Sequence, residues 1–77
     1  SYAYANKLQE QLESEIKTLM QKAKEADSEE ENDGMNIPEE IARREDRIAV
    51  IKEAKAKIEQ QAKARYKEER QAYEIGR

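Results

Sequence analysis

The chain has 77 residues, of which 43% are charged and 36% hydrophobic, and it contains no cysteine and no histidine. Disulfides, thiolate metal sites, nucleophilic cysteines and imidazole bases are therefore excluded, and the apolar content is too small for a deep globular core. The net charge of −3 is not the strongly basic balance of a free-standing nucleic-acid-binding protein, and no stretch is apolar for long enough to span a bilayer.

Residues 2–27 are predicted to form the first helix. Their apolar side chains recur at steps of three or four residues, which is the spacing of one helix face. The stripe consists of Tyr2, Ala5, Leu8, Leu12, Ile16, Leu19, Ala23 and Ala26. The surrounding positions are rich in Glu, Lys and Gln, so the segment has the composition of a coiled-coil helix.

Residues 28–37 interrupt this pattern and are predicted to form a loop, in which Asp33-Gly34 is a turn dipeptide. Part of the acidic spacing fits a twelve-residue calcium loop. The matching positions are Glu29, Glu31, Asp33, Gly34 and Glu40. A glutamate at the first ligand position and Pro38 inside the loop depart from that motif, so a solvated turn is the favoured interpretation. No metal ligand, catalytic residue or cofactor-binding residue is assigned to the chain.

Residues 38–75 are predicted to form the second helix. Pro38 fits the first helical position, where its missing N–H costs nothing, and the two glutamates that follow complement the positive end of the helix. Ile37 is favoured over Asn36 as the cap, because the residue before a proline is pushed out of the helical region. Gly76 marks the end of the helix.

The second helix carries a narrow heptad seam of Ile41, Ile48, Ile51 and Ile58. Two such stripes predict an all-α fold, an antiparallel two-helix coiled-coil hairpin that spans residues 1–77 as a single unit. We expect Leu19 to face Ile48, and Ile16 to face Ile51. We also expect Tyr2 to lie beside Arg65, near Tyr66.

This pairing predicts that Tyr66–Arg77 extends past the first helix as an overhang. Each buried leucine or isoleucine contributes about 1.5–3 kcal/mol, against an ordering cost of about 1–2 kcal/mol per residue. The isolated hairpin is therefore marginal, and we expect it to self-associate as a homodimer, for example as a four-helix bundle.

The bases of the second helix alternate with acids, which is typical of a solvated face, so direct DNA contact by this segment is the less favoured interpretation. The bases include Arg43, Arg44, Arg47, Lys52, Lys55, Lys57, Lys63, Arg65, Lys67 and Arg70. The four tyrosines are interpreted as packing residues rather than base-stacking platforms. Neighbouring carboxylates point in different directions on a helix, so Glu39/Glu40 and Glu68/Glu69 do not form catalytic pairs.

The run PEEIARREDRIAVIKEAKAKIEQQAK at Pro38–Lys63 resembles the helical insertion of bacterial insertion-sequence transposases of the DDE type, whose catalytic domain is RNase H-like. Residues 1–27 are similar to the segment that precedes it. The resemblance implies a fragment or insertion of a larger, bacterial, cytoplasmic transposase. The parent's Mg²⁺-binding catalytic carboxylates match no residue of this chain, which implies that the segment itself is not an enzyme and holds no cofactor.

The resemblance further implies a structural, assembly or DNA-positioning role in DNA transposition and recombination. The implied partners are the transposase's own catalytic domain or a second subunit, with DNA reached through the parent protein and no membrane involved. Two alternatives remain open on the residues alone: a free-standing coiled-coil dimerisation or adaptor module, and a nucleic-acid-gripping helical arm.

Overall fold

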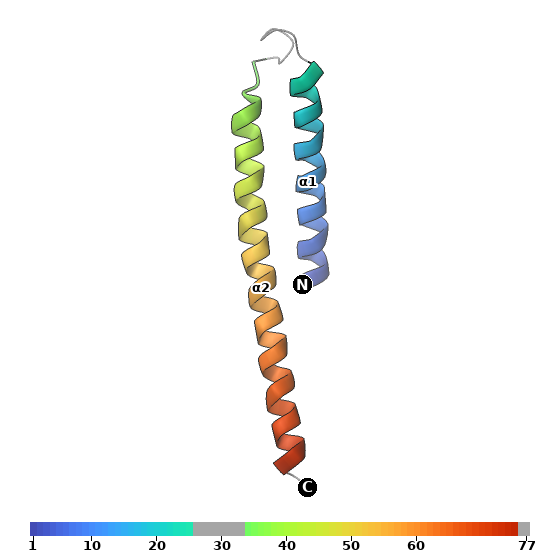
Figure 1. Ribbon diagram of the computed structural model, residues 1–77, viewed down its shortest axis with the longest axis vertical. Helices are drawn as coiled ribbons and strands as arrows, with labels where there is room; N and C mark the ends of the chain where they lie inside the picture. The colour runs from blue at the N-terminus through green and yellow to red at the C-terminus, as the bar shows by residue number, and fades with distance from the viewer. Residues whose placement is uncertain (26–33, 76–77) are drawn as a thin grey trace.

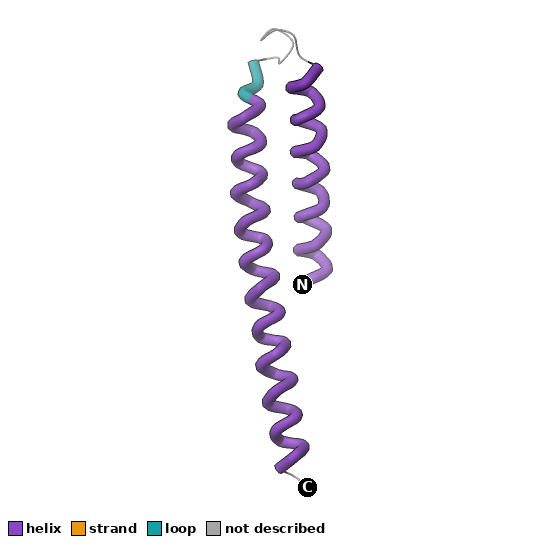
Figure 2. Tube along the Cα trace, in the orientation of Figure 1, coloured by secondary structure: helices purple, strands orange, loops and turns teal. Residues whose placement is uncertain are grey.

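The computed structural model describes residues 1–25 and 34–75, which form a rod of 72 × 15 × 14 Å. Helix α1 (Tyr2–Glu25) and helix α2 (Ile37–Ile75) run antiparallel, side by side, and α2 continues well past the first turn of α1 (Figure 1). All regular secondary structure in the described residues is helical (Figure 2). The predicted all-α antiparallel hairpin is therefore confirmed.

Helix α1 begins at a serine cap. The Ser1 hydroxyl oxygen accepts a hydrogen bond from the Tyr4 N–H at 3.2 Å, and the Ser1 carbonyl accepts one from the Ala5 N–H at 3.0 Å. A serine side chain at this position satisfies one of the N–H groups that a helix start leaves unpaired. The helix ends at Glu25, and the last two residues of the predicted span lie outside the described residues.

Helix α2 begins one residue earlier than predicted, and its cap is Asn36 rather than Ile37. The Asn36 side-chain oxygen accepts a hydrogen bond from the Glu39 N–H at 3.2 Å, and its carbonyl accepts one from the Glu40 N–H at 3.0 Å. The restriction imposed by Pro38 is outweighed because asparagine offers a side-chain acceptor and isoleucine does not. Ile37 is instead the first helical residue, so the loop predicted at 28–37 ends before it.

The core of the hairpin is a single thin seam between the helices. Four side chains are buried, with exposed fractions of 4–9%: Leu12, Leu19, Ile37 and Ile48. Half-buried residues continue the seam on either side, and they include Leu8, Ile16, Ile41, Ile51 and Ile58. Three of the four buried residues belong to the predicted stripes. The fourth, Ile37, was predicted to be a loop residue and is the most deeply buried of all.

The pairing of the two helices differs from the predicted register. Three side-chain contacts cross the seam: Tyr2 Oη donates to Glu59 Oε1 at 2.7 Å, Lys55 Nζ to Gln9 Oε1 at 3.0 Å, and Arg44 Nε to Glu15 Oε1 at 2.9 Å. The expected juxtaposition of Tyr2 with Arg65 and Tyr66 is therefore wrong. Tyr2 meets α2 six residues earlier, a displacement of about 9 Å along the helix axis.

The same contacts place Leu19 level with the turn that follows Ile41, rather than opposite Ile48. The burial of Ile37 explains the displacement. In the predicted register Ile37 would lie beyond Glu25, the last residue of α1, and would remain in solvent. Moving α2 along α1 covers Ile37 with the last turns of α1, at the cost of a longer uncovered length of α2 beyond Glu59.

Candidate interaction surface

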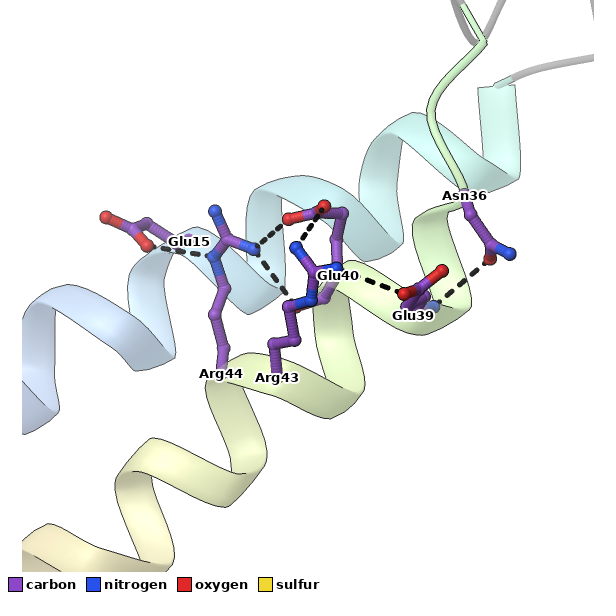
Figure 3. A network of polar contacts seen from close by, with 6 residues as sticks. All are labelled: Glu15, Asn36, Glu39, Glu40, Arg43 and Arg44. Atoms are coloured by element: carbon purple, nitrogen blue, oxygen red, sulfur yellow. Dashed lines mark hydrogen bonds and ion pairs between the residues drawn. The ribbon is translucent and has the colours of Figure 1, made fainter.

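Arg44 forms the principal polar link between the helices (Figure 3). Its Nε donates to Glu15 of α1 at 2.9 Å, and its Nη1 donates both to the Glu40 carboxylate at 2.9 Å and to the Glu40 carbonyl at 3.0 Å. The side chain is 26% exposed. Two carboxylates therefore hold the guanidinium at the edge of the seam.

Glu40 lies at the centre of this network. Arg43 also reaches it, with 3.5 Å between Nη1 and Oε1, and donates to Glu39 at 3.1 Å. The hydrogen bond from Arg44 holds the pKa of the Glu40 carboxyl below its ordinary 4.5, although partial desolvation opposes the shift. The same bond, together with that to Glu15, raises the pKa of the Arg44 guanidinium. Both groups are therefore held in their charged forms.

Tyr2 closes the opposite end of the paired region. Its hydrogen bond to Glu59 raises the pKa of the Tyr2 phenol above its ordinary 10.0. The Lys55 ammonium nitrogen lies 5.2 Å from the centre of the Tyr2 ring, within the range of a cation–π contact. The ring therefore packs at the seam between a carboxylate and an ammonium group, and the interpretation of Tyr2 as a packing residue agrees with this geometry.

One face of the hairpin carries an open apolar groove of about 480 Å³. The apolar lining consists of Leu8 and Leu12 from α1 and Val50 and Ile51 from α2. Polar side chains rim it: Gln11, Glu15, Asp46 and Arg47. Val50 is 66% exposed, although its neighbours Leu12 and Ile48 are buried. Val50 thus adds exposed apolar surface to that of the leucines beside it.

The opposite face has a second, more polar depression of about 380 Å³. Ile16, Ile48 and Ala49 form its floor, with Glu13, Glu45 and Lys52 around them. The core seam thus lies just below the surface on both faces, because two helices make one layer only. The two grooves differ in character: the first offers a leucine–valine surface, and the second is framed by charges.

Beyond Glu59, α2 has no neighbouring helix within the described residues, and every residue from Glu59 to Ile75 is exposed. We call residues 60–75 the tail. Its large apolar residues are Tyr66 and Tyr73, each 66% exposed, and Ile75, 85% exposed. The predicted overhang began at Tyr66. The observed overhang is longer because Tyr2, at the start of α1, contacts Glu59 of α2 and not Arg65.

The acidic calcium-loop candidate falls largely outside the described residues, since Glu29, Glu31 and Asp33 lie in the segment 26–33. Of its remaining members, Gly34 adopts a left-handed backbone with φ of +75°, which suits glycine. Glu40 is engaged by Arg43 and Arg44. Across residues 1–25 and 34–75, no group of three or more metal-ligating side chains comes together.

Three of the ten bases of α2 are paired with glutamates. Arg43 and Arg44 are bound to glutamates of the hairpin, and Arg70 pairs with Glu74 at 3.3 Å. The adjacent carboxylates Glu39 and Glu40 share Arg43, which lies 3.1 Å from the first and 3.5 Å from the second, whereas Arg44 reaches only Glu40.

The acceptors of the three cross-helix hydrogen bonds, Gln9, Glu15 and Glu59, were not predicted. None of them lies on an apolar stripe, so periodicity does not single them out. A signal was present for Glu15, because it stands on the flank of the seam next to Leu12 and Ile16, where a cross-helix ion pair is common in coiled coils.

We compared the chain with known protein families, curated proteins and solved structures, and found no match in any of the three. The surface described above therefore has to be interpreted from its own chemistry. Neither α1 nor the described length of α2 is long and apolar enough to cross a membrane.

Proposed function

We propose that this chain is a non-catalytic helical hairpin that docks onto another protein through the groove lined by Leu8, Leu12, Val50 and Ile51. We further propose that it acts as the helical insertion of a bacterial DNA transposase, with a role in assembly or DNA positioning during transposition. The observation that carries the docking role is the groove itself. It exposes a valine beside the seam and is rimmed by residues of both charges.

The transposase context rests on the resemblance of Pro38–Lys63, and the topology is compatible with it. The start of α1 lies beside Glu59 of α2, so the chain enters and leaves the paired part of the hairpin at neighbouring positions. A hairpin inserted in a host domain needs this arrangement, because the segments that join it to the host must lie close together. The host's catalytic domain is then the natural occupant of the groove.

Direct DNA gripping is the weaker alternative. Helix α2 carries ten basic and nine acidic residues, and α1 carries four of each. Protein surfaces that bind phosphates cluster their lysines and arginines on one face. The arginines nearest the loop are bound to glutamates within the hairpin.

The test uses the full-length protein that contains this segment. Val50→Asp places a charge in the groove, and Ala56→Asp places the same charge at an exposed position of α2 outside the groove. Burying an unpaired carboxylate in an apolar contact is costly. We expect Val50→Asp to lower the transposition frequency by about tenfold or more at equal protein level, with Ala56→Asp close to wild type.

Equal effects of the two substitutions would show that the groove is not a docking surface. The isolated chain should also show little affinity for duplex DNA. DNA binding that weakens steeply between about 50 and 200 mM salt would instead favour the gripping-arm alternative.

A further inference from the structure

The tail of α2 continues the face that α1 covers. At 100° per residue, Ala62, Tyr66 and Tyr73 fall within about 40° of the directions of Lys55 and Ile48, which face α1, and Glu69 falls within about 60°. The two tyrosines stand seven residues apart, the spacing of successive heptads. The tail therefore carries a half-apolar stripe on the same face of α2 that contacts α1 nearer the loop. The residues of this stripe are exposed.

The charges of the tail are complementary to those of a second tail placed antiparallel to it. If a second copy is laid antiparallel about a point between Glu69 and Arg70, Glu69 of each copy comes level with Arg70 of the other. Tyr66 of each copy then comes level with Tyr73 of the other, and Arg65 with Glu74. From Arg65 to Glu74, no level brings two like charges together. A parallel pairing in register would oppose every charge with itself, so the complementarity is specific to the antiparallel arrangement.

We propose that two copies of this chain associate through their tails, as an antiparallel pair centred between Glu69 and Arg70. The second copy's tail then packs on the same face of α2 as α1 does, farther along the helix. The four tyrosines Tyr66 and Tyr73 of both copies form its apolar core. The two Glu69–Arg70 pairs lie beside the two-fold axis and fix the register.

The arrangement fits the space that the hairpin leaves. In this register Ile75 of the second copy lies level with Ala64, which is five residues beyond Glu59, the α2 partner of Tyr2. Five residues correspond to about 7.5 Å of helix. The incoming helix therefore does not overlap α1 (Tyr2–Glu25). The C-terminal end of one helix approaches the N-terminal end of another, which their dipoles favour.

The interface is small. Four tyrosine side chains bury at most about 150–250 Å² each, which totals about 600–1,000 Å² and falls below the roughly 1,200–2,000 Å² of standard stable interfaces. The dimer is therefore of the weak class, and it has to be measured at protein concentrations of hundreds of micromolar. This inference uses the tail alone. It stands or falls independently of the docking groove and of the transposase context.

The first experiment is a charge swap measured by sedimentation equilibrium on the whole chain. Glu69→Arg brings two arginines together at each of the two symmetric levels, and we expect the dimer to weaken about tenfold. The double variant Glu69→Arg/Arg70→Glu restores opposite charges, and we expect it to recover most of the affinity. Glu68→Arg is the matched control, because it has the same net charge but comes level with the neutral Gln71.

The second experiment determines whether the two tails pair parallel or antiparallel. The chain has no native cysteine, so only the introduced cysteines can form disulfides. Chains carrying Tyr66→Cys are mixed with chains carrying Tyr73→Cys and oxidised. The antiparallel register predicts disulfides between the two variants and few within either variant alone, and each mixed dimer keeps one intact tyrosine pair. Circular dichroism of each variant shows whether the helices persist.

Three results would overturn the proposal. The first is a monomer at hundreds of micromolar. The second is a dimer that Glu69→Arg and Glu68→Arg affect equally, which would move the contact to the hairpin grooves. The third is cross-linking within the Tyr66→Cys chains alone, which would show a parallel pair.

Discussion

Ile37→Ala tests the register of the hairpin directly. Ile37 is 4% exposed, so truncation to alanine removes three buried methyl or methylene groups, worth about 0.8 kcal/mol each. Because the site lies at the end of the seam, its surroundings can partly close, and we expect a loss of about 2 kcal/mol in the free energy of unfolding. If α2 were paired in the register that the heptads alone suggest, Ile37 would lie past the end of α1, and the loss would be a few tenths of a kcal/mol.

The assay is urea unfolding followed by circular dichroism at 222 nm, at a concentration where sedimentation finds monomer. Ile75→Ala is the matched control, because it makes the same substitution at a site that is 85% exposed, and we expect it to change stability by less than about 0.5 kcal/mol. Equal and small effects of the two substitutions would refute the observed register. A change in the slope of the unfolding curve would indicate altered compactness rather than lost packing.

Asn36→Ala removes the α2 cap and should cost about 1 kcal/mol of stability in the same urea assay, with Asn36→Asp close to wild type. Arg44→Met should lower the melting temperature more than Arg43→Met, because only Arg44 crosses to α1. The pKa of Glu40 is lowered on folding, so unfolded Glu40 binds more protons. Its contribution is full above about pH 4.5 and is lost as pH falls through the lower folded-state pKa; Glu40→Gln should flatten that part of the stability profile measured by thermal melts.

The two helices and most of their core follow from the sequence, because burial in a hairpin is dictated by periodicity. Leu12, Leu19 and Ile48 each lie on a stripe of three- and four-residue steps, and all three are buried. The start of α1 was predicted correctly at Tyr2, and the start of α2 within one residue, at Pro38 in place of Ile37. A proline near a helix start is a local chemical signal that needs no tertiary information.

The register could not be predicted from the stripes, because a periodic seam fits its partner nearly as well after a shift of about two turns. What decides between such alternatives is the end of the seam and the polar residues beside it. Only in the observed register is Ile37 buried by α1, and only there does Arg44 pair with Glu15. The groove was missed for a related reason: Val50 lies off the α2 stripe, and it becomes part of a surface only once its α1 neighbours are known.

The groove and the tail use different lengths of α2, so both can be occupied in one assembly. In the proposed dimer the two grooves, centred near residue 49 of each copy, would be related by a two-fold axis and lie about 60 Å apart at 1.5 Å per residue. The dimer would thus hold the two proposed docking surfaces at a fixed distance from each other.

Such a dimer is also long, and its length is measurable. From Ile37 of one copy to Ile37 of the other the rod would extend about 100 Å, compared with 72 Å for a single hairpin. A side-by-side four-helix bundle, in contrast, would keep nearly the length of one hairpin and double its width. We expect small-angle scattering at high concentration to give a maximum dimension of about 100 Å or more. A dimer mass combined with a maximum dimension near that of the single hairpin would instead place the contact along the grooves.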